Sequence, residues 1–350
     1  MKSSNILIIT GGTGGHIFPA MAIGNYLELR GLNVYYLISG SKINLEGKEN
    51  MFFTRSIPFE KSIPKFIEAS ILFIINFFKG IKFLSKIKPC VIIATGSYAV
   101  APILLSSIFL RKPFYLMEQN VLPGIVNRIF SAFSKATLIA FEESKKYLKG
   151  KVIHVGLPIR ENSRLKIPKG EARKVLNLPH DKKIVLVIGG SLGAKGLVEK
   201  ILPVAIAKEY IYFIIQTGTR NFDYFNSLLS SLSPANIKLI PFIDNMGLYY
   251  SAVDLVISRA GASSCMEIVY HDKPAILVPY PYSRDKHQYF NAKVLTEGGK
   301  SIMLEETEVR AKIESLLDME NLFKGKYKEN IFIPDSEEIT YREIMSHANC

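Results

Sequence analysis

The chain has 350 residues, 48% of them hydrophobic, and a formal net charge of +13 at pH 7, which allows two domains of ordinary size. No apolar run is long enough to span a bilayer, and the apolar part of the N-terminal segment is too short for a signal peptide. The three cysteines, Cys90, Cys265 and Cys350, have neither metal-ligand spacing nor a disulfide framework, so we expect a reducing compartment.

Residues 5–21 predict a strand, a glycine-rich turn and the start of a helix. The apolar run Ile6–Ile9 does not alternate with polar residues, which is typical of a fully buried parallel strand. Four glycines follow within Gly11–Gly15, and an apolar-periodic run begins after Pro19. Free backbone N–H groups and the positive end of the helix dipole meet in such a turn. We therefore predict a binding site for phosphate or another anion, with His16 at its rim.

Two common nucleotide motifs do not fit this turn. A P-loop has Lys followed by Ser or Thr after its last glycine, whereas His16-Ile17 stands here. A dinucleotide-binding turn has an acidic residue about 20 positions further on. The next predicted strand, Val34–Ile38, ends without one, which disfavours a nicotinamide cofactor. A turn that serves only tight strand–helix packing remains the alternative.

Positive charge is concentrated in the first half of the chain. Residues 1–160 hold 20 Lys and Arg against 8 Asp and Glu, whereas residues 161–350 hold 24 against 23. Such a basic half indicates an anionic partner, and nucleic acid and anionic lipid are the two candidates.

A helix predicted over residues 66–88 discriminates between these partners. It has more apolar side chains than one core-facing stripe requires, and Lys79, Lys82 and Lys86 share one face. This pattern, with a second apolar stretch at Ile103–Leu110, favours insertion into the headgroup region of an anionic membrane. A buried helix with lysines at its end is the alternative. Nucleic acid is disfavoured because the aromatic residues are not spaced along a basic groove.

Two further predicted strands of the first half end in polar residues. Cys90–Thr95 leads into Gly96-Ser97, and Phe114–Met117 leads into Glu118-Gln119-Asn120. Polar residues at the carboxyl ends of consecutive parallel strands mark the ligand site of open α/β sheets. A helix N-terminal charge is the alternative role for Glu118.

Residues 183–193 repeat the pattern of residues 5–15: a strand, a Gly-Gly-Ser/Thr turn and a helix. A repeat about 180 residues apart predicts two doubly wound α/β domains with parallel sheets. We place the boundary near residues 158–170, which gives domains of residues 1–160 and 161–335.

The second domain has four more predicted strand positions: Ile211–Ile215, the strand end Ile240–Asp244, Asp254–Ile257 and Ala275–Pro279, the last that is obvious. A Ser-Gly turn and a helix containing Glu267 follow the third of them. The Glu267 carboxylate suits two vicinal hydroxyls of a sugar, and complementarity to the helix dipole is the alternative.

Seven motifs in this order resemble the MurG family of bacterial glycosyltransferases, which belongs to glycosyltransferase family 28. They are GGTGGHIFPA (11–20), EQN (118–120), GLPIR (156–160), GGSLGA (189–194), FID (242–244), SRAGASSCMEI (258–268) and HQYFNA (287–292). The resemblance covers about residues 5–300. It implies the GT-B architecture, in which two Rossmann-like domains face each other across a cleft. It also implies a C-terminal helix, here residues 336–350, that returns to the first domain.

The resemblance further implies an activity. N-acetylglucosamine would pass from UDP-N-acetylglucosamine to undecaprenyl-linked muramyl-pentapeptide, for peptidoglycan synthesis at the cytoplasmic face of the inner membrane. The partners would then be these two substrates and an anionic lipid surface, with no nucleic acid. No Asp-x-Asp pair is present to hold Mg²⁺ at the diphosphate, so we expect neither a metal nor a cofactor.

By the same resemblance, the second domain binds the nucleotide. The backbone of Ile243 would meet the uracil, Glu267 the ribose hydroxyls, and Ser191 with Arg160 the diphosphate. Gln288 and Asn291 would contact the transferred sugar. The turn beneath the nucleotide would be formed by Ala262, Ser263, Ser264, Cys265 and Met266.

The first domain would supply the base. The implied reaction inverts the anomeric carbon in one displacement, through an oxocarbenium-like transition state. His16 has a suitable intrinsic pKa to take the proton of the attacking hydroxyl, and Glu118 is the second candidate. A turn-stabilising hydrogen bond is the alternative role for His16. The residues facing the cleft would be Thr13, Gly14, Gly15 and Asn120.

Three positions depart from the family's pattern: Ser97 in place of Gly, Met117 in place of His and Leu157 in place of Asn. None of them replaces a proposed nucleotide contact. Three rival functions stay open: a GT-B transferase that glycosylates diacylglycerol, a UDP-sugar epimerase, and a membrane adaptor without activity.

Overall fold

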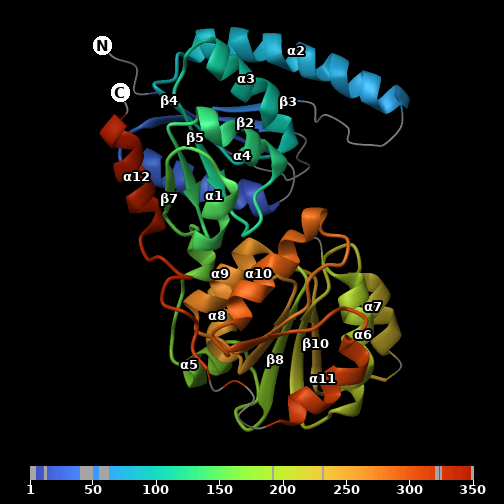
Figure 1. Ribbon diagram of the computed structural model, residues 1–350. Coiled ribbons are helices and arrows are strands. Elements are labelled where there is room, and N and C mark those ends of the chain that lie inside the picture. Colours follow the sequence, from blue (N-terminus) through green and yellow to red (C-terminus); the bar gives the residue numbers. More distant parts are fainter. Residues whose placement is uncertain are drawn as a thin grey trace. The chain divides into compact units, whose positions relative to one another are not determined.

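The computed structural model describes residues 5–11, 14–39, 50–54, 63–190, 193–230, 232–319, 323 and 325–347. The chain divides into two compact units, which we call unit 1 (Met1–Pro158 with Ile333–Cys350) and unit 2 (Ile159–Phe332). Figure 1 shows the elements of each unit.

Unit 1 is built on a seven-stranded parallel sheet of order β3-β2-β1-β4-β5-β6-β7. Its strands are β1 (Asn5–Gly11), β2 (Asn33–Ser39), β3 (Met51–Thr54), β4 (Val91–Ala94), β5 (Phe114–Glu118), β6 (Ala136–Ile139) and β7 (Val152–His154). Both faces are covered, because Ile6 and Ile8 pack into one hydrophobic cluster and Leu7 and Ile9 into another. This two-sided burial explains why the strands are continuous apolar runs.

Helices cover the two faces of this sheet (Figure 1). One face packs against α1 (Gly14–Leu29) and α12 (Ser336–His347). The other packs against α2 (Ile63–Ile87), α3 (Ala101–Phe109) and α4 (Ile125–Phe130). Short 3₁₀ turns are η1 (Tyr98–Val100), η2 (Ser131–Phe133) and η3 (Glu142–Tyr147).

The C-terminal helix α12 packs on unit 1. Its Ile344 is fully buried in the cluster that contains α1. Glu338 accepts a hydrogen bond from Arg30 Nη2 at 2.6 Å, and Glu343 pairs with Lys151 at 2.6 Å. The chain therefore leaves unit 1 at Pro158 and rejoins it at Ile333.

Unit 2 is built on a six-stranded parallel sheet of order β10-β9-β8-β11-β12-β13. Its strands are β8 (Lys183–Ile188), β9 (Ile211–Gln216), β10 (Ile237–Ile240), β11 (Leu255–Ser258), β12 (Ala275–Leu277) and β13 (Ser301–Met303). Its helices are α5 (Lys169–Val175), α6 (Lys195–Ala207), α7 (Phe222–Ser230), α8 (Met246–Ala252), α9 (Ala262–Tyr270), α10 (His287–Thr296) and α11 (Val309–Asp318), with 3₁₀ turns η4 (Glu161–Ser163) and η5 (Arg284–Lys286).

The prediction of two doubly wound parallel sheets is confirmed. The last strand that was obvious in the sequence, at Ala275–Pro279, corresponds to β12 (Ala275–Leu277), and β13 follows it. The sequence analysis also missed β3, β6 and β7. All four missed strands have three or four residues, too few for a periodic pattern to stand out from a loop.

Two composition-based expectations can be compared with the structure. Cys90 is disulfide-bonded, so the expectation of no disulfide is wrong at this residue, whereas Cys265 is a buried free thiol. Scattered spacing therefore did not exclude a disulfide at Cys90. In the part of the chain that the structure describes, no helix is long and apolar enough to cross a bilayer.

The packing of α1 on β2 gives a test of the unit 1 core. A Cβ atom added at Gly24 would lie 2.1 Å from the hydroxyl oxygen of the fully buried Tyr36. We expect Gly24→Ala to lower the free energy of unfolding by about 1–3 kcal/mol, as overpacking does, measured by urea denaturation. Gly170→Ala is the control, since nothing lies within 4 Å of its added Cβ. Equal stabilities of the two variants would contradict this packing.

Candidate functional site

Each sheet has one point where its strand order reverses. In unit 1 this point lies between β1 and β4, and in unit 2 between β8 and β11. The connections from these neighbouring strands leave toward opposite faces, so a crevice opens outside their carboxyl ends. The loops that follow β1, β4, β8 and β11 are therefore the candidate sites.

The turn after β1 places the predicted base. Gly14, Gly15 and His16 form the first turn of α1, where Gly14 is buried, Gly15 is exposed and the His16 side chain is half-buried. Thr13 lies outside the described residues. A hydrogen bond of 2.8 Å between the buried hydroxyls of Thr95 and Thr10 joins the ends of β4 and β1. The first turn of α1 thus stands at the reversal point of the sheet.

Glu118 ends β5, and its buried carboxylate organises the loop that follows. Oε1 accepts hydrogen bonds from the Asn120 backbone N–H (2.9 Å) and side-chain amide (3.4 Å). Oε2 accepts from the Gly124 backbone N–H (3.0 Å) and from Asn127 Nδ2 (2.8 Å). Burial raises the pKa of Glu118, while these donors oppose that shift. Both predicted residues, Glu118 and Asn120, are therefore parts of one hydrogen-bonded loop.

The Gly96 turn supports the same loop. Gly96 has φ +66°, a left-handed conformation that glycine adopts without strain. A Cβ atom here would lie 2.4 Å from Asn127 Nδ2, one of the Glu118 donors. The turn after β4 and the loop after β5 are thus packed against each other.

In unit 2, Glu267 is the centre of a buried network on α9. Its Oε1 accepts from Arg160 Nη2 (2.9 Å), Arg160 Nε (3.1 Å) and the Ser163 hydroxyl (2.9 Å). Its Oε2 accepts only a longer bond of 3.3 Å from the Tyr250 hydroxyl among the hydrogen bonds described. Burial raises the pKa of Tyr250 well above its usual value, so Tyr250 stays a donor. Arg160 and Glu267, predicted at different parts of the nucleotide, are therefore in direct contact.

The start of α9 is a second polar feature at the end of β11. Gly261 is the N-cap residue, and no side chain caps the helix there. The first backbone N–H of α9 that bonds to a carbonyl four residues earlier is that of Cys265, which donates to Gly261. The N–H groups of the preceding residues of the first turn, Ala262, Ser263 and Ser264, therefore point out of the helix end, where an anion is stabilised. Cys265 and Met266 are buried and pack toward the core.

The other residues predicted for unit 2 have different surroundings. The half-buried Gln288 accepts a hydrogen bond at Oε1 from Tyr280 N–H (2.9 Å), which leaves its amide group as a donor. Asn291 is fully buried and donates to the Ala260 carbonyl (3.1 Å), so it holds the turn before α9. Ile243 has a buried side chain in the loop after β10. Ser191 lies outside the described residues.

Arg259 is a residue that the sequence analysis gave no role. It follows β11 directly, is buried, and pairs with Glu306 at 2.6 Å. Its Nη1 donates to the carbonyls of Val278 and Pro279, each at 3.3 Å, and its guanidinium lies 5.4 Å from the Tyr280 ring centroid. Arg259 thereby holds the segment whose Tyr280 orients Gln288. An arginine directly after a buried strand, inside a recognised motif, was the signal that pointed to it.

Comparisons with known proteins agree with this arrangement. The profile of the glycosyltransferase family 28 N-terminal domain matches residues 6–139, and that of the C-terminal domain matches residues 184–336. The first match covers β1 to β6 of the unit 1 sheet, and the second covers the strands of the unit 2 sheet. A UDP-N-acetylglucosamine–N-acetylmuramyl-(pentapeptide) pyrophosphoryl-undecaprenol N-acetylglucosamine transferase from Caldicellulosiruptor saccharolyticus is 36% identical, over 91% of this chain and 90% of the relative.

This chain belongs to the MurG family of glycosyltransferases. A second family member, from Aquifex aeolicus, is 34% identical over 97% of this chain and 99% of its own length. The crystal structure of Acinetobacter baumannii MurG has a TM-score of 0.74 at 23% identity and covers 98% of this chain and 99% of that one. The fold is thus the GT-B fold of the MurG family.

The fold alone does not select the reaction. A UDP-GlcNAc 2-epimerase from Neisseria meningitidis has a TM-score of 0.68 at 16% identity, covering 98% of this chain and 100% of that one. Sequence identity distinguishes the two classes of protein. This chain is 36% identical to the transferase from Caldicellulosiruptor saccharolyticus but only 16% identical to the epimerase.

The Glu267 network gives a pH prediction. His271 Nε2 donates to the Ser163 carbonyl at 2.7 Å, and burial lowers the pKa of His271 to about 4. On acidification the unfolded chain protonates His271 before the folded chain does. The contribution of His271 to the free energy of unfolding is therefore constant above about pH 6.5 and falls between pH 6.5 and 4. We expect a loss of about 1–3 kcal/mol in urea denaturation. The variant His271→Gln keeps a side-chain N–H donor but has no imidazole to titrate. In this variant the decrease in the free energy of unfolding between pH 6.5 and 4 should lose the part that is due to His271. An unchanged slope would assign the loss to other groups.

Proposed function

We propose that this chain transfers N-acetylglucosamine from UDP-N-acetylglucosamine to the undecaprenyl-linked muramyl-pentapeptide. The proposal rests on membership of the MurG family, whose curated relatives carry this activity in their names. The observation that carries it in the structure is the buried Glu267 carboxylate beside the open start of α9, at the reversal point of unit 2. A carboxylate next to a helix N-terminus suits a ligand that joins a diol to a diphosphate.

We propose that UDP-N-acetylglucosamine binds to two features of unit 2, the start of α9 and the Glu267 carboxylate. The diphosphate would lie at the N–H groups of Ala262, Ser263 and Ser264, together with the Ser191 turn. The ribose hydroxyls would bond to Glu267 Oε2, because Oε1 already accepts three hydrogen bonds. Arg160 is then a positioning residue for Glu267, and its positive charge still favours the nearby diphosphate.

The sugar would be held from the other side of the same sheet edge. Gln288 would donate its amide to the transferred sugar, since its Oε1 is fixed by Tyr280. Asn291 would act through the turn before α9, because its amide group is buried against Ala260. Ile243 would contact the uracil through its backbone. Each of these assignments is a contact within unit 2.

The base is proposed to be His16. The reaction is an inverting displacement, in which the acceptor hydroxyl loses a proton as it attacks the anomeric carbon and UDP departs. Imidazole suits this step, because its intrinsic basicity matches a proton transfer near neutral pH. The contacts of Glu118 favour a positioning role, because four donors already bond to its two oxygens. Glu118 would thus place Asn120, with Gly14 and Gly15 lining the same edge.

Transfer of labelled sugar from UDP-N-acetylglucosamine to the muramyl lipid tests the proposal. We expect product with this acceptor and none with diacylglycerol, and no epimerised donor in the absence of acceptor. His16→Ala should lower kcat by about 10²–10⁴-fold, the usual share of a general base. Product with diacylglycerol alone, or donor epimerisation alone, would favour a rival function. Activity of His16→Ala within tenfold of the wild type would remove His16 as the base.

Membrane docking is proposed for the outer face of α2 and α3. Phe66 and Phe78 of α2 are 72% and 63% exposed, and Phe109 of α3 is 68% exposed. Four more apolar residues of α2 are exposed beside them: Ile67, Ile71, Ile74 and Ile75. The lysines Lys79, Lys82 and Lys86 are exposed on the same helix. An apolar face bordered by lysines suits the headgroup region of an anionic leaflet, and a lipid-linked acceptor on the cytoplasmic face of the inner membrane gives such docking a purpose.

Vesicle co-sedimentation tests the docking face. Phe66→Ser/Phe78→Ser removes two exposed rings without opening the core, and should weaken binding to phosphatidylglycerol vesicles at least tenfold. Raising the salt concentration should weaken wild-type binding as well, because the lysine contribution of about 1 kcal/mol each is screened. Tyr210→Ser and Tyr224→Ser in unit 2 are controls for the loss of exposed aromatic area. Binding that is indifferent to both salt and the double substitution would exclude this face.

A further inference from the structure

Two buried residues stand behind the Glu267 carboxylate and have no part in the donor contacts proposed above. Ser163 ends η4 and is fully buried, and His271 follows the last residue of α9 and is 8% exposed. Because both side chains are enclosed by protein, any effect on a ligand must pass through the residues that they contact. The contacts of both lead to Glu267.

Ser163 connects Glu267 to His271 through two different atoms. Its hydroxyl donates to Glu267 Oε1 (2.9 Å), and its carbonyl accepts a hydrogen bond from His271 Nε2 (2.7 Å). The imidazole must carry a proton on Nε2 to make this bond, because a carbonyl oxygen only accepts. Burial lowers the pKa of His271 to about 4, so at neutral pH the ring is a neutral donor that holds the end of η4.

Tyr250 contacts the other oxygen of the same carboxylate. Its hydroxyl donates to Glu267 Oε2 at 3.3 Å. Its ring stacks on the His271 imidazole, with 4.9 Å between the ring centroids and 20° between the ring planes. His271 therefore supports both neutral donors of Glu267, Ser163 through a hydrogen bond and Tyr250 through a ring contact.

These donors fix the plane of the Glu267 carboxylate. The last side-chain torsion of a glutamate has broad minima, so the Arg160 guanidinium by itself would allow that plane to turn. The Glu267 side chain is 3% exposed, so water competes little for its oxygens. With Ser163 on Oε1 and Tyr250 on Oε2, any rotation of the plane costs hydrogen bonds. The oxygen that stays lightly engaged is then always the same one.

We propose that Ser163 and His271 are positioning residues for the donor, which hold the Glu267 carboxylate so that Oε2 meets the two vicinal hydroxyls of the ribose. The inference rests on the proposed function and deepens it, because it names the residues that give the Glu267 site its selectivity for a diol. Tyr250 belongs to the same set through its hydroxyl and its ring. None of the three touches the reacting atoms, so none of them is a catalytic residue.

The ratio of the affinities for UDP and 2′-deoxy-UDP measures this positioning. The two ligands differ only in the hydroxyl at C2′, so a general loss of structure weakens the binding of both. A misdirected carboxylate weakens the binding of UDP alone. Calorimetry of the full wild-type chain should show a preference for UDP of about tenfold or more, which corresponds to one hydrogen bond to a charged group.

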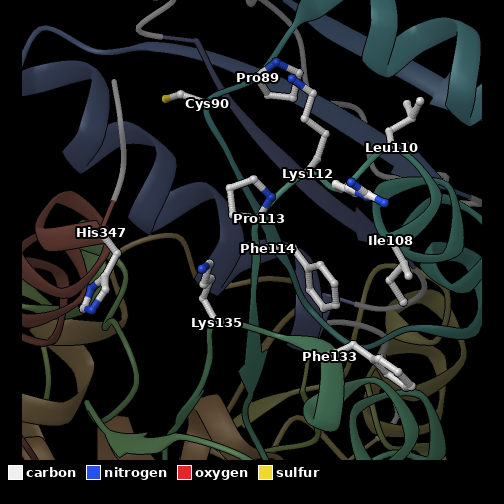
Figure 2. Close-up of a pocket in the computed structure, with 11 residues that line it drawn as sticks. Pro89, Cys90, Ile108, Leu110, Lys112, Pro113, Phe114, Phe133, Lys135 and His347 are labelled. Carbon is white, nitrogen blue, oxygen red and sulfur yellow. The ribbon is translucent and has the colours of Figure 1, made fainter.

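Binding of the diphosphate elsewhere on the chain does not disturb this ratio. Lys112, Lys135 and His347 line a cavity of about 540 Å³ in unit 1 (Figure 2), and positive side chains attract phosphate groups. No carboxylate is among the described residues that line this cavity, so it has no acidic acceptor for a ribose hydroxyl. It would bind UDP and 2′-deoxy-UDP with similar affinity.

Two substitutions test the positioning residues separately. Ser163→Ala removes only the hydroxyl, and His271→Phe keeps a ring beside Tyr250 but removes the N–H donor. Each should lower the preference for UDP to about threefold or less, because Oε2 is no longer held toward the diol. His271→Gln, which restores an N–H donor, should recover most of the preference.

Ser251→Ala is the matched control. Ser251 is a buried residue of α8 next to Tyr250, and its hydroxyl donates to the Gly247 carbonyl at 2.8 Å. None of its described hydrogen bonds reaches Glu267. This variant loses a buried hydroxyl as Ser163→Ala does, but its preference for UDP should equal that of the wild type.

The transferase assay gives a second readout. A ribose contact is present in both the ground state and the transition state, so its loss raises KM and leaves kcat unchanged. Ser163→Ala and His271→Phe should therefore raise KM for UDP-N-acetylglucosamine by about threefold or more, with kcat within about twofold of the wild type.

The possible failures are distinguishable. A full preference for UDP in both Ser163→Ala and His271→Phe would overturn the positioning role, and so would an equal loss of affinity for the two ligands, which is the result expected of residues that serve only the fold. A wild type without any preference would contradict the ribose contact of Glu267 and thereby the donor site of the proposed function. Absence of sugar transfer by a wild type that prefers UDP would contradict the proposed reaction and leave the positioning role supported.

Discussion

Parallel strand pairing, with both sheet faces buried, is the constraint on which the rest of this structure depends. Every described strand pair in the two sheets is parallel, and helices cover both faces. The strand interiors must then be apolar, and the chain can place polar side chains only where strands end. Glu118 ends a strand, Arg259 follows one, and His16 and Glu267 lie in the helix after one, for this reason.

Buried carboxylates are the second consequence of that arrangement. A carboxylate enclosed by protein is strongly disfavoured unless donors surround it. Glu118 meets this requirement with the loop that follows it, and Glu267 with Arg160, Ser163 and Tyr250. Both side chains therefore order their neighbourhood, and their remaining hydrogen-bonding capacity decides what else they can do. Glu267 retains a lightly engaged oxygen, whereas Glu118 does not.

Unit 1 carries a feature on its outside that a sugar-nucleotide site by itself does not need. It is the exposed apolar face of α2 and α3, which is bordered by lysines of α2. The charge asymmetry between the two halves of the sequence is smaller between the folded units, because the C-terminal segment Ile333–Cys350 returns four acidic residues to unit 1. Unit 1 holds 20 Lys and Arg against 12 Asp and Glu, and unit 2 holds 24 against 19.

Local sequence determined the long strands, the glycine turns, the two-sheet repeat and the family, because buried parallel strands and turn residues leave patterns within a few positions. It also named Glu267, Arg160 and Glu118 as candidates. Only the tertiary structure decided the partners of these side chains. Arg160 donates to Glu267, which is 107 residues away in the sequence, and the Asn291 amide donates to the Ala260 carbonyl. The short strand β13 and the Arg259–Glu306 pair likewise depend on segments distant in sequence. Periodicity reports which face of an element is buried, but the identity of the group packed against it is a property of the folded chain.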